Sequence, residues 1–138
     1  WVAAAYEKIP TVSLVTRGAA IVPGVVTAGL QSRIKRFVAL DAPLTLASDR
    51  RYGDGQIGAI LPGMLSDLGD IGQLVSLVAP RETWIVAGKN MQDEDLARKQ
   101  LIDSLGYAVS IYKINQSREL HVMMADGRNE WLRRVFAS

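Results

Sequence analysis

The chain has 138 residues, of which 49% are hydrophobic and 22% charged, and its formal net charge is only +2. This length supports one hydrophobic core and one domain. The small charge excess does not indicate a nucleic-acid partner. The longest apolar run is well short of the roughly 18 residues of a spanning helix, so the sequence does not indicate a membrane partner either. The absence of cysteine excludes disulfides and thiolate chemistry, the single histidine argues against a histidine-built metal centre, and nothing assigns a compartment.

The first half of the chain alternates between helix-prone and strand-like segments. Residues 2–8 predict a short helix that ends before Pro10, because the residue before proline is pushed out of the helical region. Two apolar strands are predicted at residues 12–16 and 36–40, with a helix at residues 19–30 between them. The next segment, residues 41–69, is rich in Gly and Asp and predicts a long loop, with short helical turns around residues 57–65.

The second half continues the alternation. A short helix at residues 71–78 is followed by a third strand at residues 83–87. Asp93 is a good helix N-cap, and the helix that it begins should carry an apolar stripe and stop at Gly106. The last two elements are a fourth strand at residues 108–114 and a closing helix at residues 129–136. Short apolar strands separated by helices predict an α/β fold, a three-layer sandwich with a mainly parallel sheet of about four strands flanked by helices.

One strand–turn–helix segment carries the first sign of a family. Residues 13–28 read SLVTRGAAIVPGVVTA, and the turn between strand and helix has small residues on both sides of Gly18. In α/β-hydrolases this is the place of the nucleophile elbow, where small flanking residues allow a tight turn that lifts the nucleophile above the sheet. This segment therefore resembles that elbow, with Gly18 at the position of the nucleophile.

Two later segments strengthen the likeness. Residues 52–64 and 77–88 resemble the stretch before and through the seventh strand of acetyl-xylan-esterase-like and dienelactone-hydrolase-like proteins, including an Ala-Pro-Arg before the strand. In those proteins the catalytic acid follows in a Gly-x-Asp turn, and here Asn90 takes its place. His121 falls roughly where those families place the catalytic histidine, after a predicted strand. The resemblance covers the C-terminal half of the family's fold and implies a partial α/β-hydrolase fold within a longer chain.

The resemblance implies a degenerate catalytic triad. Gly18 has no reactive atom, and the amide of Asn90 cannot stabilise an imidazolium as a carboxylate does. Asp93 and Asp95 are carboxylates close to Asn90, but they suit the cap and first turn of a helix better. His121 is then the base-equivalent residue of a site that has lost its partners. Two serines, at positions 13 and 110, fall inside predicted strands, where they are expected to be packed rather than reactive.

Other motifs give weaker signals. Gly53, Gly55 and Gly58 match the spacing of a dinucleotide fingerprint, but no strand directly precedes them, so a flexible loop is the better interpretation. The pair Gly88-Lys89 lacks the Ser or Thr of a Walker motif. We therefore expect neither a metal nor a cofactor. Five basic residues form two small clusters that are typical of solvated loop ends: Arg33, Lys35 and Arg36, and Arg50 and Arg51.

The sequence thus predicts a single α/β domain, residues 1–138, with a structural or binding role and without hydrolysis. An alternative is an active ester hydrolase, acting on an acylated carbohydrate or small ester, with His121 as base and a nucleophile outside the recognised elbow. A third possibility is a Rossmann-like binding domain that uses the loop at Gly53. In the hydrolase order the strand at residues 12–16 is internal, so it should pair with a missing N-terminal half or with a second copy.

Overall fold

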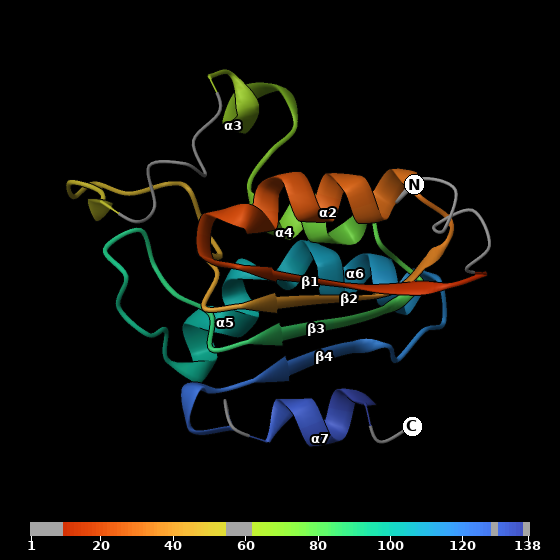
Figure 1. Ribbon diagram of the computed structural model, residues 1–138. Coiled ribbons are helices and arrows are strands. Elements are labelled where there is room, and N and C mark those ends of the chain that lie inside the picture. Colours follow the sequence, from red (N-terminus) through yellow and green to blue (C-terminus); the bar gives the residue numbers. More distant parts are fainter. Residues whose placement is uncertain (1–9, 55–61, 128–129, 137–138) are drawn as a thin grey trace, which may run out of the picture.

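The computed structural model describes residues 10–54, 62–127 and 130–136 and contains a four-stranded parallel sheet in the order β1-β2-β3-β4 (Figure 1). The strands are β1 (Val12–Arg17), β2 (Ile34–Leu40), β3 (Glu82–Val86) and β4 (Leu120–Met123). The helices are α2 (Ile21–Leu30), α3 (Met64–Asp67), α4 (Ile71–Ser76), α5 (Arg98–Ser104), α6 (Gly106–Ile114) and α7 (Trp131–Phe136), with 3-10 turns at Gly18–Ala20 and Ala125–Gly127. The predicted α/β fold with a four-stranded parallel sheet and flanking helices is confirmed.

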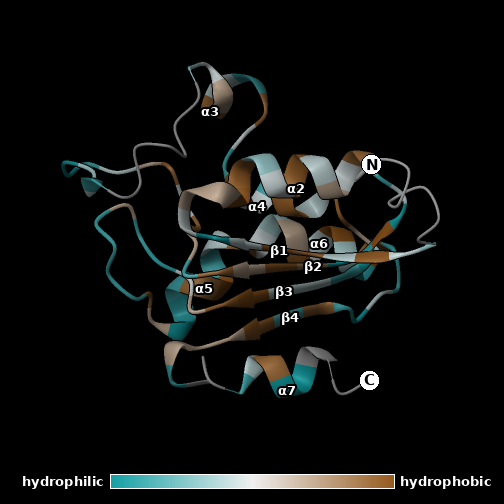
Figure 2. Cartoon of the chain, viewed as in Figure 1, coloured by the Kyte–Doolittle hydropathy of each residue, from teal (hydrophilic) through white to brown (hydrophobic). Residues whose placement is uncertain are grey.

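The helices surround the sheet. Figure 1 shows α2 and α4 along the β1 side with α6 behind the strands, while α7 lies beyond β4. All arrowheads point to the same edge of the sheet, and the loops that leave this edge are mostly hydrophilic, whereas the strands are largely apolar (Figure 2). The described part of the chain has no helix with the length and apolar character needed to cross a bilayer.

The core lies around the two inner strands. Phe37, Val38 and Ala39 in β2 and Ile85 and Val86 in β3 are all 0% exposed, so both faces of these strands are covered. Continuous apolar strands of this kind are typical of parallel sheets, and they explain why periodicity located the first three strands correctly. The outer strand β1 is less protected, since Val15 is 41% exposed.

Arg81 connects the start of β3 to the end of α2. Its Nη1 atom donates to the carbonyls of Gln31 and Ile34 at 2.9 and 2.7 Å, and its Nη2 atom to the carbonyl of Gly29 at 3.3 Å. Its Nε atom also donates to Val78 O at 3.3 Å. The last carbonyls of a helix have no partner within the helix, so this guanidinium supplies donors where α2 needs them. The arginine of the Ala-Pro-Arg motif is therefore a structural clamp.

The predicted fourth strand at residues 108–114 was wrong, because this segment forms α6. Its β-branched residues favoured a strand, but Ala108 and Tyr112, four residues apart, are both buried on one helical face. The Tyr112 hydroxyl donates a hydrogen bond inside the protein, with Arg81 O and Thr83 Oγ1 both 2.8 Å away. Burial raises the pKa of Tyr112 above its ordinary value. Contacts with β3 and α4 therefore decide the conformation of this segment, and the last strand forms only at Leu120–Met123.

The prediction of one helix from Asp93 to Gly106 was also wrong. The helix α5 begins later, with Ala97 as its N-cap, and Asp93 has a left-handed backbone with φ of 65°. The side chain of Asn90 accepts the backbone N–H groups of Gln92 and Glu94, which closes a turn where the helix was expected to start. Gly106, expected to stop the helix, instead begins α6. The helix expected at residues 2–8 lies outside the described residues.

Candidate functional site

The carboxyl edge of the sheet is built from tight turns after three adjacent strands. Gly18, Asp41 and Ala87 follow β1, β2 and β3 directly, and their φ angles are 57°, 48° and 53°. A left-handed backbone at a residue other than glycine costs of order 1 kcal/mol and is concentrated at functional sites. Because parallel strands end at the same edge, the three turns border the same side of the molecule, where ligands of α/β proteins bind.

Gly18 takes the conformation of a strained strand-to-helix turn. It lies between β1 and the 3-10 turn that leads into α2, and a Cβ atom placed on it would meet nothing within 4 Å. A side chain at this position would therefore project into open space above the sheet. The turn has room for a nucleophile, but the residue that occupies it has no reactive atom.

Asp41 is a carboxylate at this edge that the sequence analysis did not single out. Its side chain is 12% exposed and accepts a hydrogen bond from Arg17 Nε at 2.9 Å, while the Arg17 side chain is 77% exposed. Arg17 and Asp41 end adjacent strands, since Arg17 is paired with Leu40 in the sheet. Its sequence signal was an aspartate directly after an apolar strand, a residue type that tolerates the left-handed turn.

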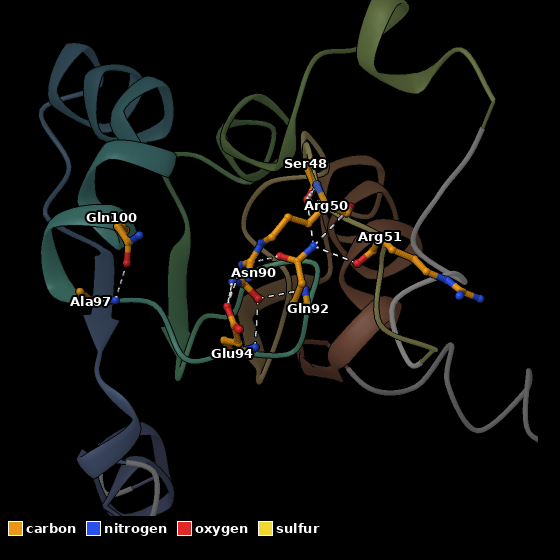
Figure 3. A network of polar contacts seen from close by, with 8 residues as sticks. All are labelled: Ser48, Arg50, Arg51, Asn90, Gln92, Glu94, Ala97 and Gln100. Carbon is orange, nitrogen blue, oxygen red and sulfur yellow. Dashed lines mark hydrogen bonds and ion pairs between the residues drawn. The ribbon is translucent and has the colours of Figure 1, made fainter.

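Asn90 is held within its own loop. Its Nδ2 atom donates to Glu94 Oε2 at 2.6 Å, and its Oδ1 atom accepts from the backbone N–H of Gln92 at 2.9 Å (Figure 3). The neighbouring carboxylates at positions 93 and 95 lie 3.2 and 3.7 Å from Lys89 Nζ. The position that the resemblance assigns to the catalytic acid therefore stabilises a turn.

A polar cleft lies between the loop after β2 and the loop after β3. Its cavity volume is about 670 Å³, and it is lined by the following residues: Thr45, Ala47, Ser48, Asp49, Arg50, Asn90, Gln92, Leu96, Gln100, Asp103 and Ser104. Figure 3 shows Gln92 reaching from one loop to the other, where its Nε2 atom donates to Ser48 Oγ at 2.9 Å and to Arg51 O at 3.1 Å. These side-chain contacts join the two loops into one wall.

An ion pair holds Arg50, one of the residues that line this polar cleft. Arg50 Nη2 lies 2.9 Å from Glu94 Oε2, and both side chains are 57% exposed. The hydrogen bond from Arg50 and then that from Asn90 lower the pKa of Glu94, and the same contact raises the pKa of Arg50. Because both groups are exposed, the pair positions the loops more than it stabilises the fold.

His121 does not follow a strand as predicted, since it is the second residue of β4. Its ring stacks on Trp84, its sheet neighbour in β3, with centroids 4.3 Å apart, and its Nε2 atom lies 3.5 Å from Glu119 Oε2. Glu119 precedes β4, so this contact lies away from the carboxyl edge that Gly18 and Asn90 border. Gly18 and Asn90 therefore both lie at the carboxyl edge, after different strands, whereas His121 lies within the last strand of the sheet.

His121 lies at the end of a row of polar and aromatic side chains on neighbouring strands, in the amino-terminal half of the sheet. Glu82 accepts from Trp84 Nε1 and from Arg36 Nε, each at 2.7 Å. Burial raises the pKa of Glu82, but the hydrogen bonds from Trp84 and Arg36 outweigh it and hold that pKa below its ordinary value. Arg36, from the first basic cluster, is thus tied to a carboxylate rather than free at a loop end.

The remaining sequence candidates have local roles. The backbone N–H of Gly53 donates to Met91 O at 2.7 Å, while Gly55 and Gly58 lie outside the described residues. Ser13 and Ser110 were expected to be packed inside strands, but both are exposed. Ser13 lies on β1, and Ser110 lies in the helix α6, where it donates to Gly106 O at 2.9 Å. Within residues 10–54, 62–127 and 130–136, no group of three or more acidic or histidine side chains is arranged to hold a metal.

Comparison with known proteins adds no relative. No protein-family model, no curated protein and no solved structure matches this chain. The geometry of the carboxyl edge is therefore the basis for a functional assignment.

Proposed function

We propose that this chain is an α/β-hydrolase-like domain that has lost hydrolysis and binds a polyhydroxylated ligand, such as a carbohydrate, in the polar cleft at its carboxyl edge. The observation that carries the loss of hydrolysis is Gly18, whose left-handed turn after β1 leaves open space where a nucleophile would stand. The order β1-β2-β3-β4 with a helix after each strand supports the likeness to the second half of an α/β-hydrolase sheet.

The lining of the polar cleft supports a hydroxyl-rich ligand. Hydroxyl and amide side chains surround two carboxylates, Asp49 and Asp103, to which the structure gives no ion pair among the described residues. Carboxylates accept strong hydrogen bonds from hydroxyl groups. The Oε1 atom of Gln100 accepts from the Ala97 backbone, which orients its amide donors at the same wall. A volume of about 670 Å³ lies within the usual range of ligand sites.

Loss of hydrolysis is the stronger half of the proposal. Active ester hydrolysis through His121, the alternative, would need this side chain beside the nucleophile at the carboxyl edge, but it stacks on Trp84 within the sheet. We expect no saturable hydrolysis of p-nitrophenyl acetate by the wild type, and none by Gly18→Ser, because base and nucleophile act as a unit. Saturable turnover that disappears in His121→Ala would contradict this half.

Ligand binding is tested by calorimetric titration with xylotetraose and with cellotetraose, with backbone amide shifts recorded by NMR. We expect shifts in the loops that line the polar cleft and at least a fivefold weaker affinity in Asp103→Ala, since it removes a hydrogen bond of about 1 kcal/mol or more to the ligand. Asp67→Ala, in α3, changes another exposed helical aspartate and is the matched control. If neither saccharide binds, the carbohydrate proposal is wrong, and the proposed loss of hydrolysis is unaffected.

We also propose that β1 pairs with the β1 strand of a second copy. Among the described residues this strand pairs only with β2, and residues 12–16 contain neither lysine nor proline to guard its outer edge. Light scattering of the isolated chain should show a dimer, and Val15→Lys, which places a charge on the strand, should shift it to the monomer. Leu30→Lys, on α2 and 79% exposed in the wild type, should leave the dimer intact. A wild-type monomer at about 100 μM would contradict this arrangement, because an interface of ordinary size binds more tightly than that.

A further inference from the structure

Another cavity lies between α6 and β4, the outer strand at the end of the sheet away from β1. Its volume is about 330 Å³, and it is lined by Val109, Tyr112, Lys113, Ser117, Arg118, Leu120 and Val122. We call it the α6–β4 groove. None of its residues lines the polar cleft, so it is a separate feature of the molecule.

The floor and walls of the α6–β4 groove are apolar. Leu120 and Val122 alternate with His121 and Met123 along β4, so their side chains share one face of the strand. Val122 is 37% exposed, which means that α6 does not cover the strand completely. The Tyr112 hydroxyl is engaged with Arg81 O and Thr83 Oγ1, so the groove receives the ring of this residue rather than its polar atom.

Two cations border this apolar groove. Lys113 and Arg118 are exposed, and the structure gives neither of them an ion pair among the residues that it describes. No acidic side chain lines the groove. The nearest acid in sequence, Glu119, directly precedes β4 and contacts His121 Nε2 at 3.5 Å. The remaining polar side chain, Ser117, donates its hydroxyl to Pro80 O at 3.0 Å.

We infer that the α6–β4 groove binds an anionic amphiphile, a monomeric aliphatic carboxylate whose chain lies along the apolar wall and whose carboxylate meets Lys113 and Arg118. A neutral polar ligand would find few free partners on this wall. A cationic amphiphile would be repelled at the mouth, where both charges are positive. The volume, about 330 Å³, suits a chain of medium length.

The experiment is a titration of the intact chain with sodium decanoate below its micelle concentration, at low salt, followed by calorimetry and by backbone amide shifts. We expect shifts at α6 and β4, and a decanoate affinity that falls as salt is added. Lys113→Gln combined with Arg118→Gln should weaken decanoate about tenfold, because each exposed ion pair contributes up to roughly 1 kcal/mol. The same double variant should bind 1-decanol as the wild type does.

Two further variants test whether a change in decanoate affinity comes from the groove itself rather than from the net charge of the protein or from loss of folding. Val109→Trp should fill the groove and weaken both decanoate and 1-decanol, with its far-ultraviolet circular dichroism unchanged. Lys35→Gln combined with Lys99→Gln removes two exposed lysines outside the groove, and decanoate affinity should not change.

Three outcomes would overturn the inference: no decanoate binding, equal affinity for decanoate and decyltrimethylammonium, or an affinity that Lys113→Gln with Arg118→Gln leaves unchanged. Sedimentation with vesicles containing phosphatidylglycerol, without binding of monomeric decanoate, would also overturn it. In that case the two cations would serve a lipid surface rather than a single bound molecule. The groove shares no residue with the polar cleft, so none of these results bears on the saccharide titration.

Discussion

Replacing Arg81 by methionine should lower the free energy of unfolding by about 3 kcal/mol. The substitution keeps an apolar stem of similar length but removes the donors to Gly29 O, Gln31 O and Ile34 O. Hydrogen bonds from a charged donor contribute about 1.5–3 kcal/mol, and partly buried carbonyls left without partners add their own desolvation cost. In a domain of this size the melting temperature should fall by roughly 10 °C.

Urea denaturation at neutral pH measures this change through the transition midpoint. Arg81→Lys keeps the charge but cannot reach all the carbonyls at once, so its loss should be intermediate. Arg118→Met removes an exposed arginine without a described ion pair and should stay within about 0.5 kcal/mol of the wild type. A midpoint for Arg81→Met equal to that of Arg118→Met would show that the clamp does not stabilise the fold.

Replacing Gly72 by alanine should cost about 1 kcal/mol of stability, although alanine favours helices. A Cβ atom on Gly72 would lie 2.4 Å from the backbone carbonyl oxygen of Ser104, at the end of α5. A backbone atom cannot rotate away as a side chain can, so α4 must move away from the junction of α5 and α6. Overpacking of this kind costs typically 1–3 kcal/mol and outweighs the roughly 1 kcal/mol that alanine gains over glycine in a helix.

Gly106 is the matched control for this substitution. It also lies in a helix, but a Cβ atom on it would meet nothing within 4 Å. Gly106→Ala should therefore be neutral or slightly stabilising in the same urea experiment. If Gly72→Ala were as stable as Gly106→Ala, with an unchanged dependence on urea, the close approach of α4 to the α5–α6 junction would not exist in solution.

At the carboxyl edge, the residue pattern predicted one feature of the candidate site and missed two others. A glycine between small residues after an apolar strand predicted a tight turn at position 18, and the structure confirms it with a φ of 57°. The roles of Asn90 and Asp41 could not be predicted in the same way. Asn90 binds backbone groups of its own loop, and Asp41 meets Arg17 only because adjacent strands bring their ends together.

By itself, the sequence determined the first three strands. The apolar runs of β2 and β3, which are buried on both sides, and the shorter run of the less protected β1 could be predicted from local pattern, together with the helices between them. Tertiary structure decided the conformation of residues 106–123. An apolar segment such as residues 108–114 can bury itself as a strand or as a helix, and the contact of Tyr112 with Thr83 and Arg81 selects the helix. That choice moves the last strand to Leu120–Met123, places His121 inside it against Trp84, and opens the α6–β4 groove.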